Sequence, residues 1–210
     1  MTTDSPSAGP STTLGRKALK AHIQYDFVQA NQEYSENGTA DAQQLTSGPR
    51  SRTAIITCVD SRSSPEHFYQ LKENDAIVIR NGGGRTNDPG AIRSLAIIQA
   101  TSELKEIKVV HHANCGSLFY TDKWTKDMVT ENDVRAPAGP YRDGCGCWVQ
   151  AISFLPFCRK DDEASDDEIV KNSVKGDVEY LRNHPLIKPS VLVTGWFYNL
   201  ATGIVEPVEC

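Results

Sequence analysis

Short apolar runs alternate with helix-like patterns along the 210 residues of the chain. Five runs are rich in β-branched or aromatic residues, which is typical of strands; they span residues 53–58, 76–80, 107–111, 190–198 and 204–208. Apolar residues recur at helical spacing in three segments: 16–34, 89 to about 105, and the segment that follows 165. This alternation predicts an α/β fold, with a mainly parallel central β-sheet flanked by helices and an antiparallel edge strand after the turn at 201–203.

Local capping signals place the starts of the helices. Asp88 and Pro89 suit the N-cap and the first turn of one helix. Ser165 and Glu168 form a capping box that opens another helix, which gives the acidic run around them a structural explanation. A short helix is expected over residues 65–70, because proline is well tolerated at the first helical position.

Composition and charge describe one acidic globular domain. The net charge is −5 and no long basic stretch is present, which argues against nucleic acid as a partner, and no apolar run is long enough to cross a membrane. Residues 1–15 are polar and are expected to form a disordered tail. Residues 16–210 are expected to form a single catalytic domain with an N-terminal helical arm over about 16–50. Because the first residues lack a secretory or mitochondrial pattern, a cytoplasmic location is expected.

Candidate metal ligands follow two of the predicted strands. Cys58 ends the first strand, and His112 and Cys115 come directly after the third. The carboxyl ends of parallel strands meet at one crevice, so these side chains are expected to converge. One cysteine at a strand end is usually a small core residue, but two thiols with an imidazole form the ligand set of an open zinc site. Cys115 is also expected to open a helix, whose N-terminus would stabilise its thiolate.

Asp60 and Arg62 follow the first ligand at intervals of two residues. Arg62 is expected to hold Asp60 by a bidentate bond; the simpler alternative is an ordinary surface ion pair. Two thiolates neutralise the charge of Zn²⁺, so its bound water should be less acidic than one held with three imidazoles. Asp60 either compensates by accepting a hydrogen bond from that water or coordinates the metal and closes the site.

These motifs resemble the β-class carbonic anhydrases. The resemblance rests on Cys58-x-Asp60-x-Arg62, on the glycine-rich loop 80–84, and on His112-x-x-Cys115-Gly116. It covers residues 20 to 208, and the short form of the chain is similar to fungal members. It implies reversible hydration of carbon dioxide to bicarbonate, one Zn²⁺ per chain, and a homodimer embraced by N-terminal helices.

The resemblance also assigns a role to each site residue. It implies that the zinc ligands are Cys58, His112 and Cys115. It implies that Asp60 orients the reacting water while Arg62 keeps Asp60 ionised and off the metal. The backbone N–H of Gly116 is expected to meet an oxygen of the substrate.

Two departures from the family pattern leave alternatives open. The family usually has glycine at the position of His111, which either packs the site or serves as a proton shuttle; the packing role is favoured. Cys145 and Cys147 form a Cys-x-Cys motif that could bind metal or act as a redox pair, although an incidental loop is the simpler interpretation.

Two other functions compete: hydrolysis of carbon disulfide or carbonyl sulfide on the same site, and a weakly active or non-catalytic homologue that senses zinc or bicarbonate.

Overall fold

The structure is a computed structural model that describes residues 25–36, 48–125, 153, 155–157 and 164–210. The chain divides into two compact units, residues 1–40 and residues 41–210. In the first unit, α1 (Phe27–Glu36) is preceded by Asp26, whose side chain accepts hydrogen bonds from two backbone N–H groups of the first turn. This helix confirms the later part of the predicted segment 16–34. The predicted tail and residues 16–24 lie outside the described residues.

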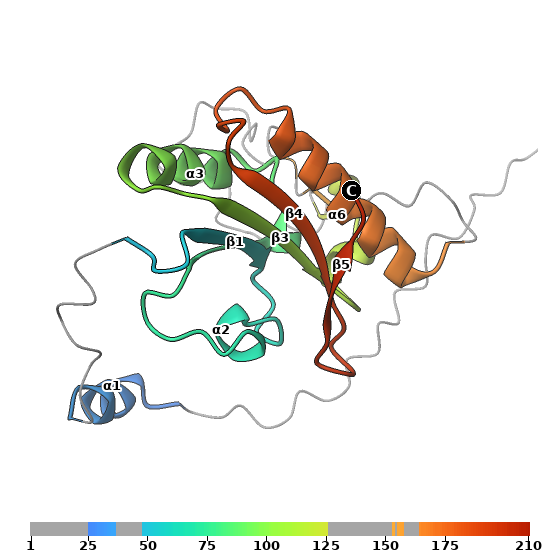
Figure 1. Cartoon of the computed structure of the whole chain (residues 1–210). Helices are drawn as coiled ribbons and strands as arrows, with labels where there is room; N and C mark the ends of the chain where they lie inside the picture. Colours follow the sequence, from blue (N-terminus) through green and yellow to red (C-terminus); the bar gives the residue numbers. More distant parts are fainter. Residues whose placement is uncertain (1–24, 37–47, 126–152, 154, 158–163) are drawn as a thin grey trace, which may run out of the picture. The chain divides into compact units, whose positions relative to one another are not determined.

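The second unit is built on a five-stranded sheet of order β2-β1-β3-β4-β5 (Figure 1). Its strands are β1 (Thr53–Cys58), β2 (Ile77–Asn81), β3 (Glu106–His112), β4 (Leu192–Tyr198) and β5 (Val205–Val208). All neighbouring pairs are parallel except β4 and β5, which are antiparallel. The predicted fold class is therefore confirmed, with strand ends that shift by one or two residues at most.

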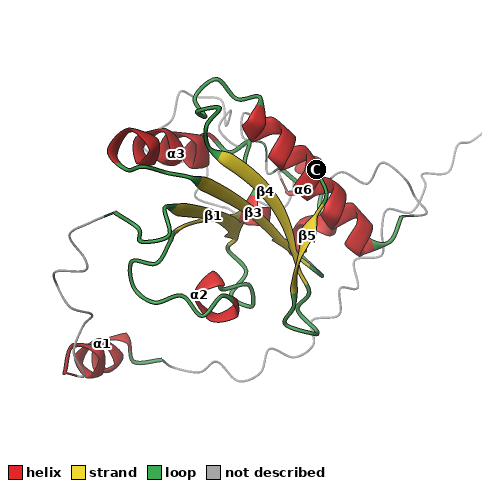
Figure 2. Cartoon of the chain, in the orientation of Figure 1, coloured by secondary structure: helices red, strands yellow, loops and turns green. Residues whose placement is uncertain are grey.

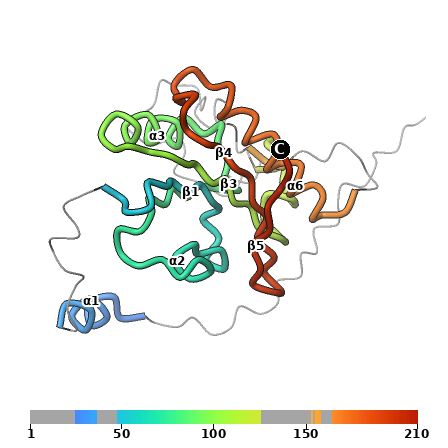
Figure 3. Tube along the Cα trace, in the orientation of Figure 1, coloured from blue at the N-terminus to red at the C-terminus, as the bar shows by residue number. Residues whose placement is uncertain are grey.

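The helices α3 (Pro89–Thr101) and α6 (Asp166–Arg182) pack on one face of this sheet (Figures 1 and 2). That face carries the alternate strand residues that form the main core with both helices: Ala54, Ile56, Ile107, Val109 and Val193 from the strands, Ile92 and Leu95 from α3, and Val174, Val178 and Leu181 from α6. The short helix α2 (Pro65–Phe68) joins β1 to β2, as the chain trace in Figure 3 shows, and its Phe68 ring lies 4.4 Å from that of Tyr198. The sheet thus has one fully helix-covered face.

Glycine allows α6 to approach the sheet closely. A Cβ atom added to Gly195 in β4 would lie 2.6 Å from a methyl carbon of Val174 and 3.3 Å from one of Val178. Any larger residue would push the helix away from the sheet. The absence of a side chain at Gly195 therefore lets the valine side chains of α6 pack close to β4.

Both predicted caps are present. The Asp88 carboxylate accepts a hydrogen bond from the N–H of Gly90, and Ser165 and Glu168 exchange the two hydrogen bonds of a capping box. The predicted end of α3 near residue 105 was wrong, because Lys105 donates its N–H to the carbonyl of Arg52 and so already belongs to the entry into the sheet. The short helix predicted over 65–70 ends earlier, at Phe68. Among the described helices, none combines the length and apolar character needed to span a membrane.

Candidate metal centre

Three ligating side chains converge where β1 and β3 end. The sulfur atoms of Cys58 and Cys115 lie 3.9 Å apart. These two atoms and a ring nitrogen of His112 all lie within 4.8 Å of one another. All three residues are buried. A tetrahedral zinc with bonds of about 2.3 Å to sulfur would hold two thiolates about 3.8 Å apart. The spacing of the two thiols therefore fits zinc without rearrangement.

The imidazole of His112 is in the tautomer that a metal requires. Its Nδ1 lies 2.9 Å from the carbonyl oxygen of Ala113, which only accepts, so Nδ1 carries the proton. The Nε2 atom then presents a lone pair. It is buried, and it has no hydrogen-bond partner among the residues that the structure describes. A buried nitrogen without a partner is costly, and a metal ion is the natural group to satisfy it.

The two thiols are hydrogen-bonded to each other, and their pKa values move in opposite directions. The hydrogen bond from Cys115 and the neighbouring His112 lower the pKa of Cys58 to about 4, although burial acts in the opposite direction. The pKa of Cys115 is raised by its hydrogen bond to Cys58, by burial and by the charge on Cys58. The helix predicted to open at Cys115 is not an α-helix, and its effect on the Cys115 thiolate stays a prediction. The segment after it is a single 3-10 turn, η3 (Gly116–Leu118), which is too short to carry a substantial dipole.

The backbone of Cys58 is held by the glycine-rich turn that follows β2. This turn, η2 (Gly82–Gly84), places Gly84 at φ +69°, and a Cβ atom there would lie 2.9 Å from the backbone nitrogen of Cys58. The guanidinium of Arg80 donates to the carbonyl oxygens of Cys58 and Asp60, at 3.0 and 2.7 Å. Both contacts fix the strand end that carries the first ligand.

Asp60 is gripped by Arg62 at the edge of the cluster. The Nε and Nη2 atoms of Arg62 donate to the two carboxylate oxygens at 2.9 and 2.6 Å, and the Arg62 backbone N–H donates to the same carboxylate. This hydrogen bonding, together with the charge of Arg62, lowers the pKa of Asp60 to about 2 despite some burial. Arg62 also donates to the carbonyl oxygen of Asn114, 3.1 Å away, and so ties the two ligand-bearing loops together. One oxygen of Asp60 lies 3.9 Å from Nε2 of His112.

Comparison with known proteins gives the family of the chain. The family model of carbonic anhydrase matches residues 53–205. The β-carbonic anhydrase 1 of Mycobacterium bovis is 36% identical over 87% of this chain and 96% of its own length. The chain belongs to the β-carbonic anhydrase family.

Two further relatives show the breadth of the likeness. The solved carbonic anhydrase from Glaciozyma antarctica has a TM-score of 0.72 and 30% identity, with 89% of this chain and 98% of that chain covered. The carbon disulfide hydrolase of an Acidianus strain is 34% identical over 72% of this chain and 74% of its own length. Family membership therefore supports a lyase-type enzyme.

Gly116 lies directly after Cys115, the last of the three candidate ligands. It is exposed, and a Cβ atom added there would meet no other atom within 4 Å. The backbone at this position is therefore open to a small molecule that approaches the cluster.

His111 is fully buried, which favours the packing role over the proton shuttle. Its ring stacks on Phe157 with centroids 5.1 Å apart. Its Nε2 lies 3.1 Å from the carbonyl oxygen of Gly84 and 3.2 Å from an oxygen of Asp177. Both partners only accept, so this nitrogen carries a proton that is already engaged.

Sequence reasoning missed the buried pair of Arg85 and Asp177. A usable signal was present, because position 177 falls on the apolar face of α6, where a charged residue is unusual.

Cys145 and Cys147 lie outside the described residues.

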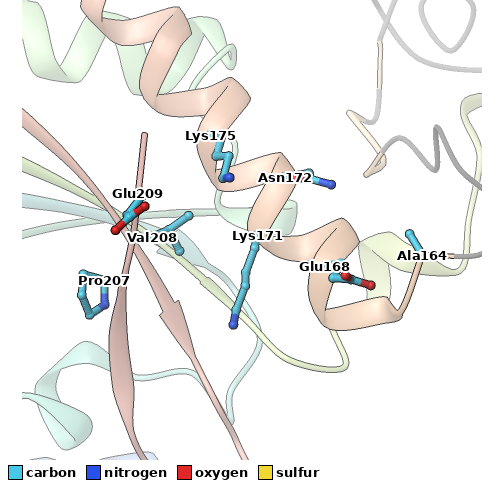
Figure 4. Close-up of a pocket in the computed structure, with 8 residues that line it drawn as sticks. All are labelled: Ala164, Glu168, Lys171, Asn172, Lys175, Pro207, Val208 and Glu209. Atoms are coloured by element: carbon cyan, nitrogen blue, oxygen red, sulfur yellow. The ribbon is translucent and has the colours of Figure 1, made fainter.

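A groove of about 520 Å³ lies between α6 and the C-terminal strand (Figure 4). Its lining includes Lys171 and Lys175 of α6 and Pro207 of β5, and it contains none of the candidate metal ligands. Lys171 is already paired with Glu206 and lies over the ring of Phe197. The groove is therefore separate from the chemistry of the Cys–His–Cys cluster.

Proposed function

We propose that this chain is a zinc-dependent carbonic anhydrase that converts carbon dioxide and water reversibly to bicarbonate and a proton. The observation that carries the proposal is the Nε2 of His112, which has no hydrogen-bond partner in the described part of the chain and lies in one buried cluster with the two thiols. Cys58, His112 and Cys115 would hold the ion. A zinc ion held there would supply a Lewis acid that makes water a better nucleophile.

Asp60 orients the reacting water in this proposal. A carboxylate whose pKa is about 2 is a poor base near neutral pH, so Asp60 acts as a hydrogen-bond acceptor and does not remove the proton permanently. Arg62 occupies both carboxylate oxygens, and this grip holds Asp60 away from the metal position. The proton leaves to buffer.

Substrate binding is assigned to the loop that carries the last ligand. Gly116 is an exposed residue that follows Cys115 directly, and its backbone N–H is proposed to bind an oxygen of carbon dioxide or bicarbonate. The side chains that pack behind the two thiols are apolar, among them Phe157 and Phe197, and they keep bulk water away from the inner side of the cluster.

The activity is tested by stopped-flow hydration of carbon dioxide, with the zinc content of the same sample measured. The wild-type chain is expected to hold one zinc and to accelerate hydration, while Cys58→Ser and His112→Ala lose both zinc and activity. Asp60→Asn is expected to keep zinc and lose most turnover. Asp75→Asn is the matched control, since Asp75 forms an Arg-paired carboxylate outside the cluster and should leave the rate unchanged.

Other results would contradict carbon dioxide hydration. A zinc-loaded chain with no rate above buffer would indicate the non-catalytic sensing homologue. Turnover of carbon disulfide or carbonyl sulfide without turnover of carbon dioxide would indicate the hydrolase, which the similarity to the Acidianus enzyme keeps as the second candidate.

We also infer that the working form is a homodimer, which rests on the resemblance to the family. Light scattering of the purified chain at micromolar concentration measures its mass directly. A monomer mass across the concentration range of the activity assay would contradict the dimer.

A further inference from the structure

A buried carboxylate lies behind the metal centre and has no part in the proposed reaction. Asp177 is 2% exposed and sits on the apolar face of α6, between Val174 and Val178. A charge in such a place is strongly unfavourable unless it is paired and hydrogen-bonded. The groups that satisfy Asp177 therefore show what this part of the fold holds in place.

Three side chains meet the carboxylate. Arg85 donates through Nε at 2.8 Å and through Nη2 at 3.3 Å, and the hydroxyl of Thr86 donates at 3.0 Å. Nε2 of His111 lies 3.2 Å from the same group. Burial raises the pKa of Asp177, but hydrogen bonding to His111 and the charges of His111 and Arg85 outweigh it and lower that pKa. Asp177 thus binds side chains from two segments, the turn that ends at Arg85 and Thr86 and the strand that contains His111.

One path leads from Asp177 to Cys58. Arg85 directly follows Gly84, which lies so near Cys58 that an added Cβ atom would be 2.9 Å from the backbone nitrogen of Cys58. The Nη1 atom of Arg85 also donates to the carbonyl oxygens of Leu155 and Pro156, at 2.9 and 3.0 Å. Fixing Arg85 therefore fixes the turn against which the first ligand rests.

A second path leads from Asp177 to His112. His111 is the residue before this ligand, and its Nε2 bonds both Asp177 and the carbonyl oxygen of Gly84. The ring of His111 is held on its face by Phe157. The carboxylate therefore ties the strand that carries the second ligand to the turn that supports the first.

We propose that Asp177 is a positioning residue that sets the ligands Cys58 and His112 at their mutual spacing, through Arg85 on one side and His111 on the other. The inference rests on the proposed zinc site and adds a residue from α6 to it. Groups that orient metal ligands from behind typically change metal affinity or activity by about 10- to 100-fold when they are removed. Asp177→Asn keeps the shape of the side chain and removes the charge, so it is expected to weaken zinc binding by about that factor.

A purely structural role is separated by a control on the same helix. Val174→Ala removes buried methyl groups one turn from Asp177 and loosens α6 without touching the hydrogen-bond network. For the full-length wild type and both variants, zinc affinity is measured by competition with a chromophoric chelator. The visible spectrum of the Co²⁺-loaded protein reports the ligand geometry, and the melting temperature reports stability.

The expected result is a loss of zinc affinity and shifted Co²⁺ bands in Asp177→Asn, with both unchanged in Val174→Ala despite its lower melting temperature. The inference would be overturned if Asp177→Asn kept the zinc affinity and the Co²⁺ spectrum of the wild type. It would also be overturned if Asp177→Asn and Val174→Ala lost the same zinc affinity when their melting temperatures fell equally. If Asp177→Asn does not fold, Thr86→Val removes one donor to the carboxylate and is judged against the same control, with a smaller loss in the same direction expected. A wild-type chain that binds no zinc would instead refute the proposed function, and with it this inference.

Discussion

Replacement of Gly84 by alanine tests whether the turn after β2 supports the first metal ligand. An alanine at φ +69° occupies the left-handed region, which costs about 1–2 kcal/mol. Its Cβ atom would lie 2.9 Å from both the backbone nitrogen of Cys58 and the backbone carbon of Thr57, and relief of such overpacking costs about 1–3 kcal/mol more. The sum is about 2–5 kcal/mol, a large share of the roughly 5–15 kcal/mol that stabilises a typical domain.

Denaturant unfolding of the metal-free and zinc-loaded proteins measures both consequences. Gly84→Ala should lower the unfolding midpoint of the metal-free chain, and it should also reduce the extra stability that zinc confers, because the clash displaces Cys58. That extra stability is about 2.7 kcal/mol when free zinc is 100-fold above its Kd.

Gly82→Ala is the matched control in the same turn, since its Cβ atom would meet nothing within 4 Å. It should change stability by no more than about 0.5 kcal/mol. If both variants unfold at the same denaturant concentration and gain equally from zinc, the supporting role of Gly84 is refuted.

Three more outcomes are expected. Arg62→Lys keeps the charge but loses the two-pronged grip on Asp60, so hydration should slow by about tenfold at unchanged zinc content in a stopped-flow and metal assay; an unchanged rate would show that the grip is dispensable. Ser165→Ala removes the cap of α6 and should lower the free energy of unfolding by about 1 kcal/mol in a denaturant titration, with an equal midpoint counting against the cap. Because the folded-state pKa of Asp177 is depressed, its stabilisation is present above the ordinary aspartate pKa of about 3.9 and is lost as pH falls toward the lower folded value. The free energy of unfolding, measured between pH 5 and 3, should therefore fall less steeply with pH in Asp177→Asn than in the wild type. Parallel plots of this free energy against pH for the two proteins would contradict the linkage.

The strands and the convergence of the candidate ligands were predictable because both depend on local sequence. Runs of β-branched residues mark buried strands, and the ends of those strands place Cys58 and His112 at one edge of a parallel sheet. The capping box at Ser165 is equally local, and it is present as predicted. The roles of Asp60, Arg62 and Gly116 remain predictions that the proposed experiments test.

The features that were missed depend on contacts between distant segments. The end of α3 is set by a backbone bond between Lys105 and Arg52, which helical periodicity cannot reveal. The helix expected after Cys115 is only a 3-10 turn that starts with glycine, a poor helix former. Asp177 meets Arg85 across 92 positions of the sequence, so only the fold brings the two together.

The strand order also has a consequence for how the chain assembles. β3 lies beside β4, which comes only after α6 in the sequence, whereas β1, β2 and β3 follow one another closely. All three candidate ligands therefore belong to the half that leaves the ribosome first, and Asp177 arrives with the second half. Contacts between remote segments form slowly because long loops must close. Docking of the second half, which brings Asp177 to Arg85 and His111, is thus expected to be the late, slow event of folding.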